Sequence, residues 1–180
     1  LICVRVRKAG EGRTFRAPAF CRRIHGKTIK AKDPLRGETM NRDYPSVTVT
    51  KKAERAIRAG HPWVYDAEVT DDPGGWADGD IADVYAPNGK WLGAGFVNGT
   101  SKLRVRLLTR NANDRPDEAF FRRRIRYAVE YRRAVMGEQF SACRLVFGES
   151  DGLPGFTADR YNDVIVTEVL CAGTDRIRMI

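Results

Sequence analysis

Alternating hydrophobic and polar residues predict several short strands in the middle of the chain. Residues 46–50 (SVTVT) and 103–109 (LRVRLLT) alternate and are rich in β-branched or large apolar side chains. Residues 81–85 and 90–97 flank Asn88-Gly89, a dipeptide that is a strong signal for a hairpin turn. Together these segments predict a small, mostly antiparallel barrel.

One helix is predicted within this barrel, directly after its first strand. Residues 51–59 are helix formers with an apolar face, Thr50 can cap the helix, and Gly60 suits the left-handed position that ends it. Pro62 cannot continue a helix and favours an extended residue before it. Residues 61–65 are therefore expected to leave the helix as a short strand.

A second helix and two further strands are predicted after a linker at residues 111–116. Strand-like segments at 143–147 and 163–170 flank a loop at 148–161, GESDGLPGFTADRY, which contains the turn dipeptides Asp-Gly and Pro-Gly. Residues 117–136 predict the helix, because an apolar stripe recurs there at helical spacing. The stripe consists of Phe121, Ile125, Ala128, Val129 and Val135.

The carboxylates of this loop have two explanations. Glu149 and Asp151 have the chemistry of a general acid/base pair. Acidic side chains in a tight turn also accept hydrogen bonds from the backbone amides of the turn itself. We favour this capping role, because the sequence shows no catalytic partner for the pair.

The positive charge of the chain is concentrated at its N-terminus. The formal net charge is +9, yet residues 1–39 hold 11 Lys/Arg and 3 Asp/Glu, whereas residues 40–180 hold 21 and 20. The first 39 residues also lack a sustained strand or helix period. They are either a disordered, nucleic-acid-binding arm or a basic leader that is not native protein, with translation starting at Met40. We favour the second explanation.

A local basic surface is expected in the rest of the chain. Residues 102–144 carry 12 basic and 5 acidic side chains, whereas residues 63–91 carry 1 and 7. The strand with Arg104 and Arg106 and the arginine-rich helix that follows would form a face that engages phosphates. We expect charge reversal at these two arginines to weaken nucleic-acid binding most.

Other classes of protein are disfavoured by the sequence. The four cysteines are far apart and form no Cys-x-x-Cys pair, which argues against a zinc ribbon and for free thiols in the cytoplasm. His61 has no second ligand placed to complete a metal site. No apolar run is long enough to cross a bilayer, so no membrane partner is expected.

The order of these segments resembles one family. VTVT, GHPWVY, GKWLGAGFVN, SKLRVRLLT, FFRRRI and the GESDGLPGFTADRY loop are similar to the N-terminal half of bacterial class I S-adenosylmethionine-dependent 23S rRNA (cytosine-C5) methyltransferases. The resemblance covers about residues 46–175 and leaves 1–39 unmatched. It implies an α+β fold with a PUA-like RNA-binding pseudobarrel at 46–110. A small, incomplete α/β domain of strand-strand-helix-strand-strand type would follow at 117–180.

The resemblance also implies that chemistry lies outside this sequence. We expect the chain to be truncated before a Rossmann-like methyltransferase domain, which would be its missing C-terminal partner and would bind S-adenosylmethionine. No Gly-rich turn for the cofactor and no nucleophilic cysteine segment is recognisable in the sequence. Cys143 and Cys171 lie in apolar, strand-like runs typical of inert thiols. Catalytic, cofactor-binding and metal-binding residues are therefore all predicted to be absent.

Ribosomal RNA is the partner that the resemblance implies. Trp63, Tyr65, Trp91 and Phe96 are predicted to lie in the core, although Trp63 has the chemistry to stack on a base. The candidate RNA ligands border the first helix, the loop before the last barrel strand, that strand and the second helix. They are Lys51, Lys52, Arg55, Arg58, Gly60, His61, Asn98, Ser101, Lys102, Arg104, Arg106, Arg122, Arg123 and Arg126.

Three functions are compatible with these patterns. The leading one is the RNA-binding, substrate-recognition half of an rRNA methyltransferase that transfers a methyl group to cytosine C5. The alternative is a stand-alone, non-enzymatic PUA-type RNA-binding protein. The third is a protein-interaction module that forms a homodimer through unpaired strand edges.

Overall fold

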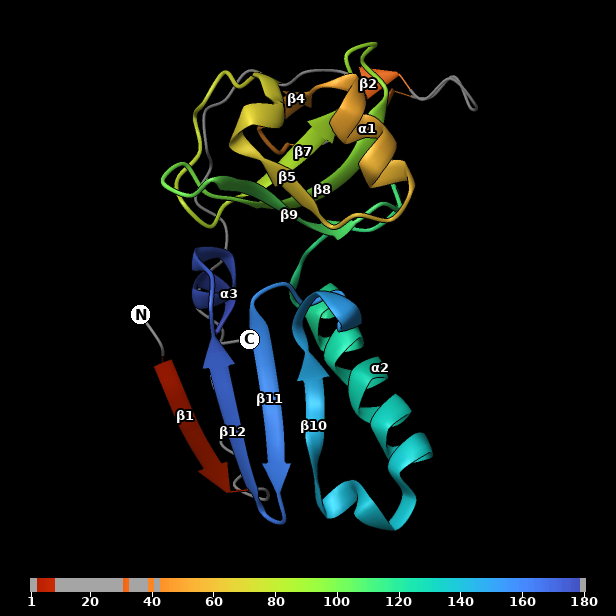
Figure 1. The fold of residues 1–180 in the computed structure, drawn as a ribbon, viewed down its shortest axis with the longest axis vertical. Helices are drawn as coiled ribbons and strands as arrows, with labels where there is room; N and C mark the ends of the chain where they lie inside the picture. Colours follow the sequence, from red (N-terminus) through yellow and green to blue (C-terminus); the bar gives the residue numbers. More distant parts are fainter. Residues whose placement is uncertain (1–2, 9–30, 33–38, 41–42, 179–180) are drawn as a thin grey trace. The chain divides into compact units, whose positions relative to one another are not determined.

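The computed structural model describes residues 3–8, 31–32, 39–40 and 43–178. The chain forms two compact units (Figure 1): the first lies within residues 24–114, and the second combines residues 3–8 with residues 115–178. We describe each unit by itself. No helix in the described part of the chain is long and apolar enough to cross a membrane.

The first unit is a curled six-stranded sheet with one helix. Its strands run in the order β5-β9-β8-β7-β4-β6, with β4 parallel to β7 and every other pair antiparallel. The predicted, mostly antiparallel arrangement with an early helix is therefore confirmed as a curled sheet, whose end strands β5 and β6 do not pair with each other. The elements are β4 (Ser46–Val49), α1 (Lys51–Arg58), β5 (Trp63–Tyr65), the 3-10 turn η1 (Asp66–Glu68), β6 (Val69–Asp71), β7 (Ile81–Tyr85), β8 (Trp91–Val97) and β9 (Leu103–Thr109).

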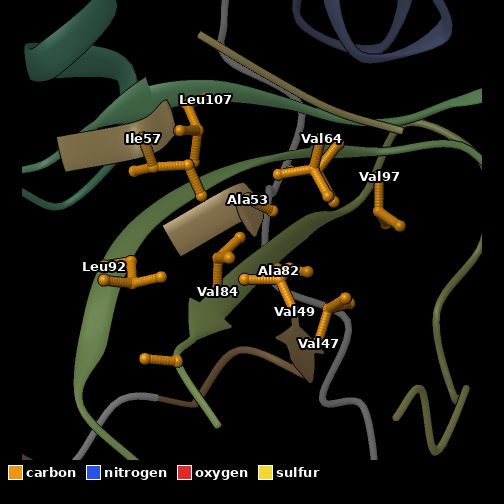
Figure 2. Close-up of a cluster of buried hydrophobic side chains, with 12 residues drawn as sticks. Val47, Val49, Ala53, Ile57, Val64, Ala82, Val84, Leu92, Val97 and Leu107 are labelled. Atoms are coloured by element: carbon orange, nitrogen blue, oxygen red, sulfur yellow. The ribbon is translucent and has the colours of Figure 1, made fainter. Parts of the chain in front are cut away.

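The core of this unit lies between the sheet and α1. Ala53 and Ile57, one helical turn apart, are 0% and 1% exposed and belong to the same cluster as the inward side chains of the strands (Figure 2). Each fully buried Val, Leu or Ile contributes about 1.5–3 kcal/mol to folding. The cluster comprises Val47, Val49, Ala53, Ile57, Val64, Ala82, Val84, Ala86, Leu92, Val97, Val105 and Leu107.

Helix α1 begins and ends as its sequence predicts. The Thr50 hydroxyl accepts a hydrogen bond of 3.2 Å from the Ala53 amide. Gly60 has φ +105°, the left-handed conformation that glycine adopts without strain. The Arg110 guanidinium, directly after β9, donates to the Ile57 carbonyl at 3.2 Å and thereby ties the helix end to the sheet.

The second unit contains an antiparallel four-stranded sheet and a long helix. The strand order is β1-β12-β11-β10, and all three pairings are antiparallel. The Asp117 carboxylate caps the long helix by accepting a 2.8 Å hydrogen bond from the Phe120 amide. The elements are β1 (Cys3–Lys8), α2 (Glu118–Met136), η2 (Gly137–Ser141), β10 (Ala142–Phe147), η3 (Gly148–Asp151), β11 (Phe156–Tyr161), β12 (Val164–Val169) and α3 (Ala172–Ile177).

The loop predicted over residues 148–161 is shorter than expected. Its second half, Phe156–Tyr161, is strand β11 and pairs with both β10 and β12. Thr157 and Ala158 are buried there, so packing between two neighbouring strands outweighs the polar composition of the segment. Asn162, with φ 54°, turns the chain into β12.

The apolar stripe of α2 is only partly buried. Phe121 and Ala128 face the interior with Phe120, as the helical spacing indicates. Ile125 and Val135, which belong to the same stripe, are 36% and 56% exposed. A single helix on a narrow sheet buries only some of the apolar residues that recur at helical spacing along it.

Most of the predicted leader, residues 1–39, lies outside the described residues. Within it, β1 pairs with β12, so the disordered alternative does not describe Cys3–Lys8. Ala31–Lys32 pairs with Thr39–Met40. The start of translation at Met40 stays a prediction.

Candidate nucleic-acid interface

Helix α1 presents a basic face on the side away from the core. Lys51, Arg55 and Arg58 are exposed and lie at spacings of four and three residues, which places them on one side of the helix. The buried Ala53 and Ile57 lie on the other side. Arg58 forms an ion pair of 2.8 Å with Glu54, whereas Lys51 and Arg55 make no ion pair with any residue that the structure describes. Lys52 is also exposed, next to this face.

The turn after α1 is open. Gly60 is exposed, and an added Cβ would meet only the Arg110 guanidinium, at 3.8 Å. The His61 amide donates to the Ala56 carbonyl at 2.9 Å, so the following strand starts directly at the helix end. The C-terminal end of a helix carries a partial negative charge, so phosphates would bind here through side chains and not through the backbone. Arg55, Arg58 and Arg110 supply the positive charge.

Strand β5 brings aromatic side chains to the surface beside β9. Trp63 pairs with Arg106 across the two strands. Trp63 is half-buried and Tyr65 is 42% exposed, so the predicted core positions are wrong for Tyr65 and only partly met for Trp63. Trp63 and Tyr65 lie on the face of β5 opposite the buried Val64. Phe96 is buried as predicted, and Trp91 is half-buried, with its indole N–H donating 2.9 Å to Asp83.

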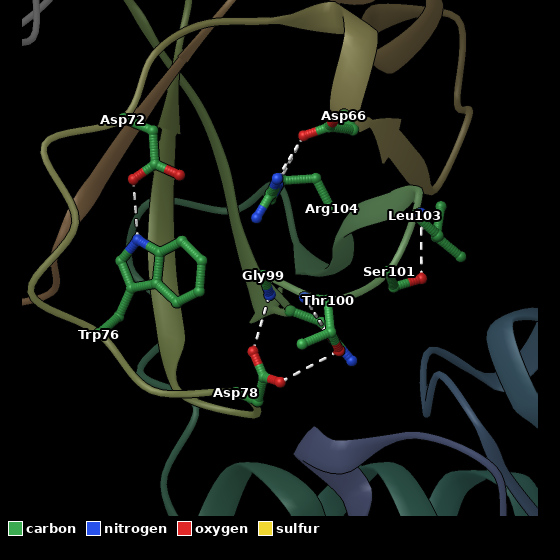
Figure 3. Close-up of polar contacts among 10 residues, drawn as sticks. Asp66, Asp72, Trp76, Asp78, Gly99, Thr100, Ser101, Leu103 and Arg104 are labelled. Atoms are coloured by element: carbon green, nitrogen blue, oxygen red, sulfur yellow. Dashed lines mark hydrogen bonds and ion pairs between the residues drawn. The ribbon is translucent and has the colours of Figure 1, made fainter.

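The polar side chains between β8 and β9 stabilise their own loop. The Asn98 side-chain oxygen accepts from the Thr100 amide at 3.0 Å, and the Ser101 hydroxyl accepts from the Leu103 amide at 3.1 Å. Asp78 accepts from the Gly99 amide at 2.7 Å (Figure 3). Asn98 and Ser101 thus have structural partners, while Lys102 is exposed.

Arg104 is held inside this acidic surrounding. Its Nε donates to the Asp66 carboxylate at 3.1 Å, and its guanidinium lies 5.8 Å from the centre of the Trp76 ring. Only 17% of the Arg104 side chain is exposed. Trp76 is in turn fixed by a 2.9 Å hydrogen bond to Asp72 (Figure 3). Trp76 was not among the predicted site residues, although an aromatic residue within an acidic connector is an unusual signal.

The predicted ligands of the first unit therefore fall into two groups. The α1 group is basic and exposed, and includes Lys51, Lys52, Arg55 and Arg58. The loop group lies among Asp66, Asp72 and Asp78, whose charges oppose a phosphate. The expectation that Arg104 and Arg106 dominate binding stays a prediction, but Arg104 has its charge neutralised by Asp66.

The arginines of α2 belong to the second unit. Arg122 pairs with Glu118 at 2.7 Å, and the Arg123 guanidinium lies 5.5 Å from the Phe120 ring centre. Arg126 is exposed. These contacts are typical of a solvated helix face, and a role in RNA binding stays a prediction for all three arginines.

Carboxylates of the β10–β11 loop and its neighbour form structural ion pairs. Asp151 accepts a 2.6 Å hydrogen bond from the Phe147 amide, in agreement with the favoured capping role. It also accepts two bonds of 2.8 Å from Arg132. On the adjacent strands Arg144 donates to Asp159 at 2.8 and 2.9 Å, and this hydrogen bonding lowers the pKa of the Asp159 carboxyl.

Cys143 and Cys171 are free and half-buried. The Cys143 thiol donates to the Phe140 carbonyl at 3.5 Å, and the Cys171 thiol to the Pro154 carbonyl at 3.4 Å. Neither contact activates a thiolate. Within the described ranges, no group of three or more His, Cys, Asp and Glu side chains is arranged to hold a metal ion.

Comparison with known proteins agrees with the geometry of the first unit. The profile of a PUA-like domain matches residues 47–110. Two curated relatives are both called Ribosomal RNA large subunit methyltransferase I. The Aeromonas hydrophila protein is 37% identical over 131 residues, 72% of this chain and 33% of its own length. The Shewanella amazonensis protein is 41% identical over 123 residues, 68% of this chain and 31% of its own.

Two solved structures share the fold. One is a Streptococcus mutans protein assigned as a SAM-dependent methyltransferase, with a TM-score of 0.63 and 17% identity over 75% of this chain and 35% of that chain. The other, assigned as a methyltransferase and complexed with SAH, gives the same values. The chain thus spans about a third of the length of the curated relatives it matches.

Proposed function

We propose that this chain, which contains a PUA-like domain and is homologous to part of the ribosomal RNA large subunit methyltransferases, recognises RNA for such an enzyme. The complete protein would transfer a methyl group from S-adenosylmethionine to cytosine C5 in 23S rRNA. The observation that carries the proposal is the exposed basic face of α1 on the PUA-like unit. A phosphate backbone is the ligand that such a face attracts.

The α1 group is the proposed centre of the RNA contact. Lys51 and Arg55 have no carboxylate partner among the described residues, so binding a phosphate breaks no existing ion pair. Lys52 and Arg58 extend the same surface, and Gly60 lets a backbone approach without a side chain in the way. Asn98, Ser101, Lys102, Arg104 and Arg106 would form a secondary contact, because several of them are already bonded within their loop.

The described residues do not fit S-adenosylmethionine. A Rossmann-like site lies at the carboxyl ends of parallel strands. The sheet of the second unit is antiparallel in all its described pairings, and the first unit contains one parallel pair, β4 with β7. We therefore assign cofactor binding and methyl transfer to the part of the relatives that this chain does not span, about two thirds of their length. No described residue is given a role in the chemical step.

The test is RNA binding by the 180-residue chain. Fluorescence anisotropy with labelled fragments of large-subunit rRNA should show affinity that falls steeply with salt. Replacing Lys51 and Arg55 by Glu should weaken binding about tenfold or more and flatten the salt dependence. Lys90→Glu, a single charge reversal at an exposed hairpin turn of the same unit, should leave binding nearly unchanged, whereas Lys51→Glu or Arg55→Glu alone should already weaken it. Equal losses in both variants would refute a specific α1 contact.

The alternative function is a stand-alone, non-enzymatic RNA-binding protein. It makes the same prediction for RNA affinity, so the two must be separated by activity of the complete gene product. Methylation of unmodified rRNA, with the methyl group mapped to cytosine C5, would support the enzyme. RNA binding without methylation would favour the alternative. The homodimer stays a prediction that sedimentation with and without RNA would test.

A further inference from the structure

Three ring-bearing side chains line up where the chain leaves α1. His61, Trp63 and Tyr65 alternate with Pro62 and Val64, so they point to one side of the strand. The His61 ring meets the Trp63 ring edge-on, with 5.8 Å between the centres. The His61 and Tyr65 rings are nearly parallel, with centres 6.4 Å apart and planes at 27°. We call these three residues the aromatic strip.

The aromatic strip faces away from the core. Val64, between Trp63 and Tyr65, is 0% exposed and packs in the hydrophobic cluster, which assigns the opposite side to the rings. Strand β5 is also the last strand of its sheet order, paired with β9 alone. Tyr65 is 42% exposed, and no other large hydrophobic side chain is as exposed among the described residues of the first unit.

Positive charge flanks the aromatic strip at both ends. At its start, the His61 amide bonds to the Ala56 carbonyl of α1, whose basic face carries Arg55 and Arg58. At its far end, the Asp66 amide donates to the Lys102 carbonyl at 2.8 Å, which places exposed Lys102 beside Tyr65. Two carboxylates also lie there: Asp66, which pairs with Arg104, and Glu68, which accepts a 3.1 Å hydrogen bond from the Tyr65 amide. The ligand that fits is anionic and presents a flat ring.

We infer that the aromatic strip is a stacking surface for an unpaired nucleobase of the RNA. Stacking on an exposed ring needs a free base face, which bases inside a duplex do not offer. The adjacent phosphates would meet the α1 group on one side and Lys102 on the other. This inference rests on the proposed RNA binding and deepens it. It assigns to the first unit a preference for RNA in which an unstacked base lies next to a base-paired segment.

The test compares Tyr65→Ala with Tyr65→Phe in the 180-residue chain. The probes are a single-stranded RNA and a perfect duplex of the same length, both fluorescently labelled. Loss of one stacked base should weaken single-strand binding roughly fivefold to hundredfold, with the salt dependence unchanged. Duplex binding should change less than about twofold, and Tyr65→Phe should retain single-strand affinity. Tyr127→Ala removes a tyrosine of 58% exposure from α2 and should change neither.

A direct readout of stacking is available from 2-aminopurine placed in the single-stranded probe. Its fluorescence should be quenched by the wild type and by Tyr65→Phe, and far less by Tyr65→Ala at saturating protein. If the wild type binds RNA and Tyr65→Ala binds each probe as tightly as the wild type does, the stacking surface is refuted while RNA binding by α1 stands. If the wild type binds neither probe, the proposed function fails together with this inference.

Discussion

The Arg132 guanidinium on α2 holds the Asp151 carboxylate through two hydrogen bonds of 2.8 Å. The two side chains are only 14% and 12% exposed, and the same carboxylate accepts the Phe147 amide at 2.6 Å. One pair of residues thus connects the long helix, the end of β10 and the following turn. Removing the Arg132–Asp151 ion pair therefore tests whether the Asp151 carboxylate of this loop stabilises the fold.

Arg132→Leu should destabilise the protein by about 3 kcal/mol, because it leaves a largely buried carboxylate without its cation. Urea unfolding followed by circular dichroism measures the change. Arg122→Leu is the matched control on the same helix, since its ion pair with Glu118 is exposed and should contribute only about 0.3–0.5 kcal/mol. Equal effects would show that Asp151 does not depend on Arg132.

Gly95→Ala should be among the most destabilising changes in the first unit. An added Cβ would lie 2.7 Å from the carbonyl carbon of Arg106 and 2.8 Å from the Leu107 Cα, so β8 and β9 would have to separate. We expect a loss of about 3 kcal/mol, measured by tryptophan fluorescence during urea unfolding. All three tryptophans, Trp63, Trp76 and Trp91, report on this unit.

The control for Gly95→Ala is a glycine with open space around it. Gly89 has φ +78° in the hairpin turn, and nothing lies within 4 Å of an added Cβ. Gly89→Ala should cost about 1 kcal/mol through backbone strain alone. A Gly95→Ala effect no larger than this would contradict the close approach of the two strands.

Arg104→Ala should lower stability more than it lowers RNA affinity. The substitution removes the ion pair with Asp66 and the contact with the Trp76 ring, together about 1 kcal/mol. Affinity should fall less than for Arg55→Ala, because Asp66 already neutralises the Arg104 charge. Denaturation and RNA titration of both variants make the comparison. A larger affinity loss for Arg104→Ala would restore it as a principal phosphate ligand.

The Arg144–Asp159 pair should make stability depend on pH in the acid range. Hydrogen bonding from Arg144 lowers the pKa of Asp159 below its ordinary value of 3.8. A carboxyl group with a lowered native pKa stabilises the fold above its ordinary pKa, and the contribution disappears as pH falls through the lowered native value. The pair is partly exposed, so the expected contribution is only about 0.5 kcal/mol.

Asp159→Asn should remove this pH-dependent contribution. The variant should be less stable than the wild type at neutral pH, and the difference should vanish as the pH falls below the native pKa of Asp159. Urea unfolding at several pH values between roughly 7 and 2.5 measures it. Asp163→Asn in the exposed hairpin turn is the control and should change little. A difference that grows toward acid pH would have the wrong sign for this pair.

Local sequence signals predicted most of the fold. Asn88-Gly89, the Thr50 cap and Gly60 each correspond to a turn or helix end in the structure. The strand at Phe156–Tyr161 was missed, because it alternates weakly and is specified by its two neighbouring strands. The parallel pairing of β4 with β7 was also unpredictable from local patterns, since it depends on contacts distant in sequence.

The candidate site was predicted less completely than the fold. Charge and spacing located the basic face of α1, because the polar and apolar sides of an amphipathic helix can be read from its sequence. They did not show that Asp66, 38 positions earlier in the sequence, neutralises Arg104. Nor did they show that the Arg104 guanidinium lies over the Trp76 ring. Nor did they place Tyr65 at the surface, since an aromatic residue in a strand has the same sequence signature on either face.

The pairing of Trp63 with Arg106 also constrains how this protein is made. The two partners are 43 positions apart, 106 minus 63, so β5 has no strand to pair with until β9 has left the ribosome. At typical synthesis rates this delay lasts roughly 2–9 seconds. During that interval Trp63 and Val64 form part of an unpaired, apolar edge. A nascent chain that stalls before β9 would therefore be a substrate for chaperones and prone to aggregation.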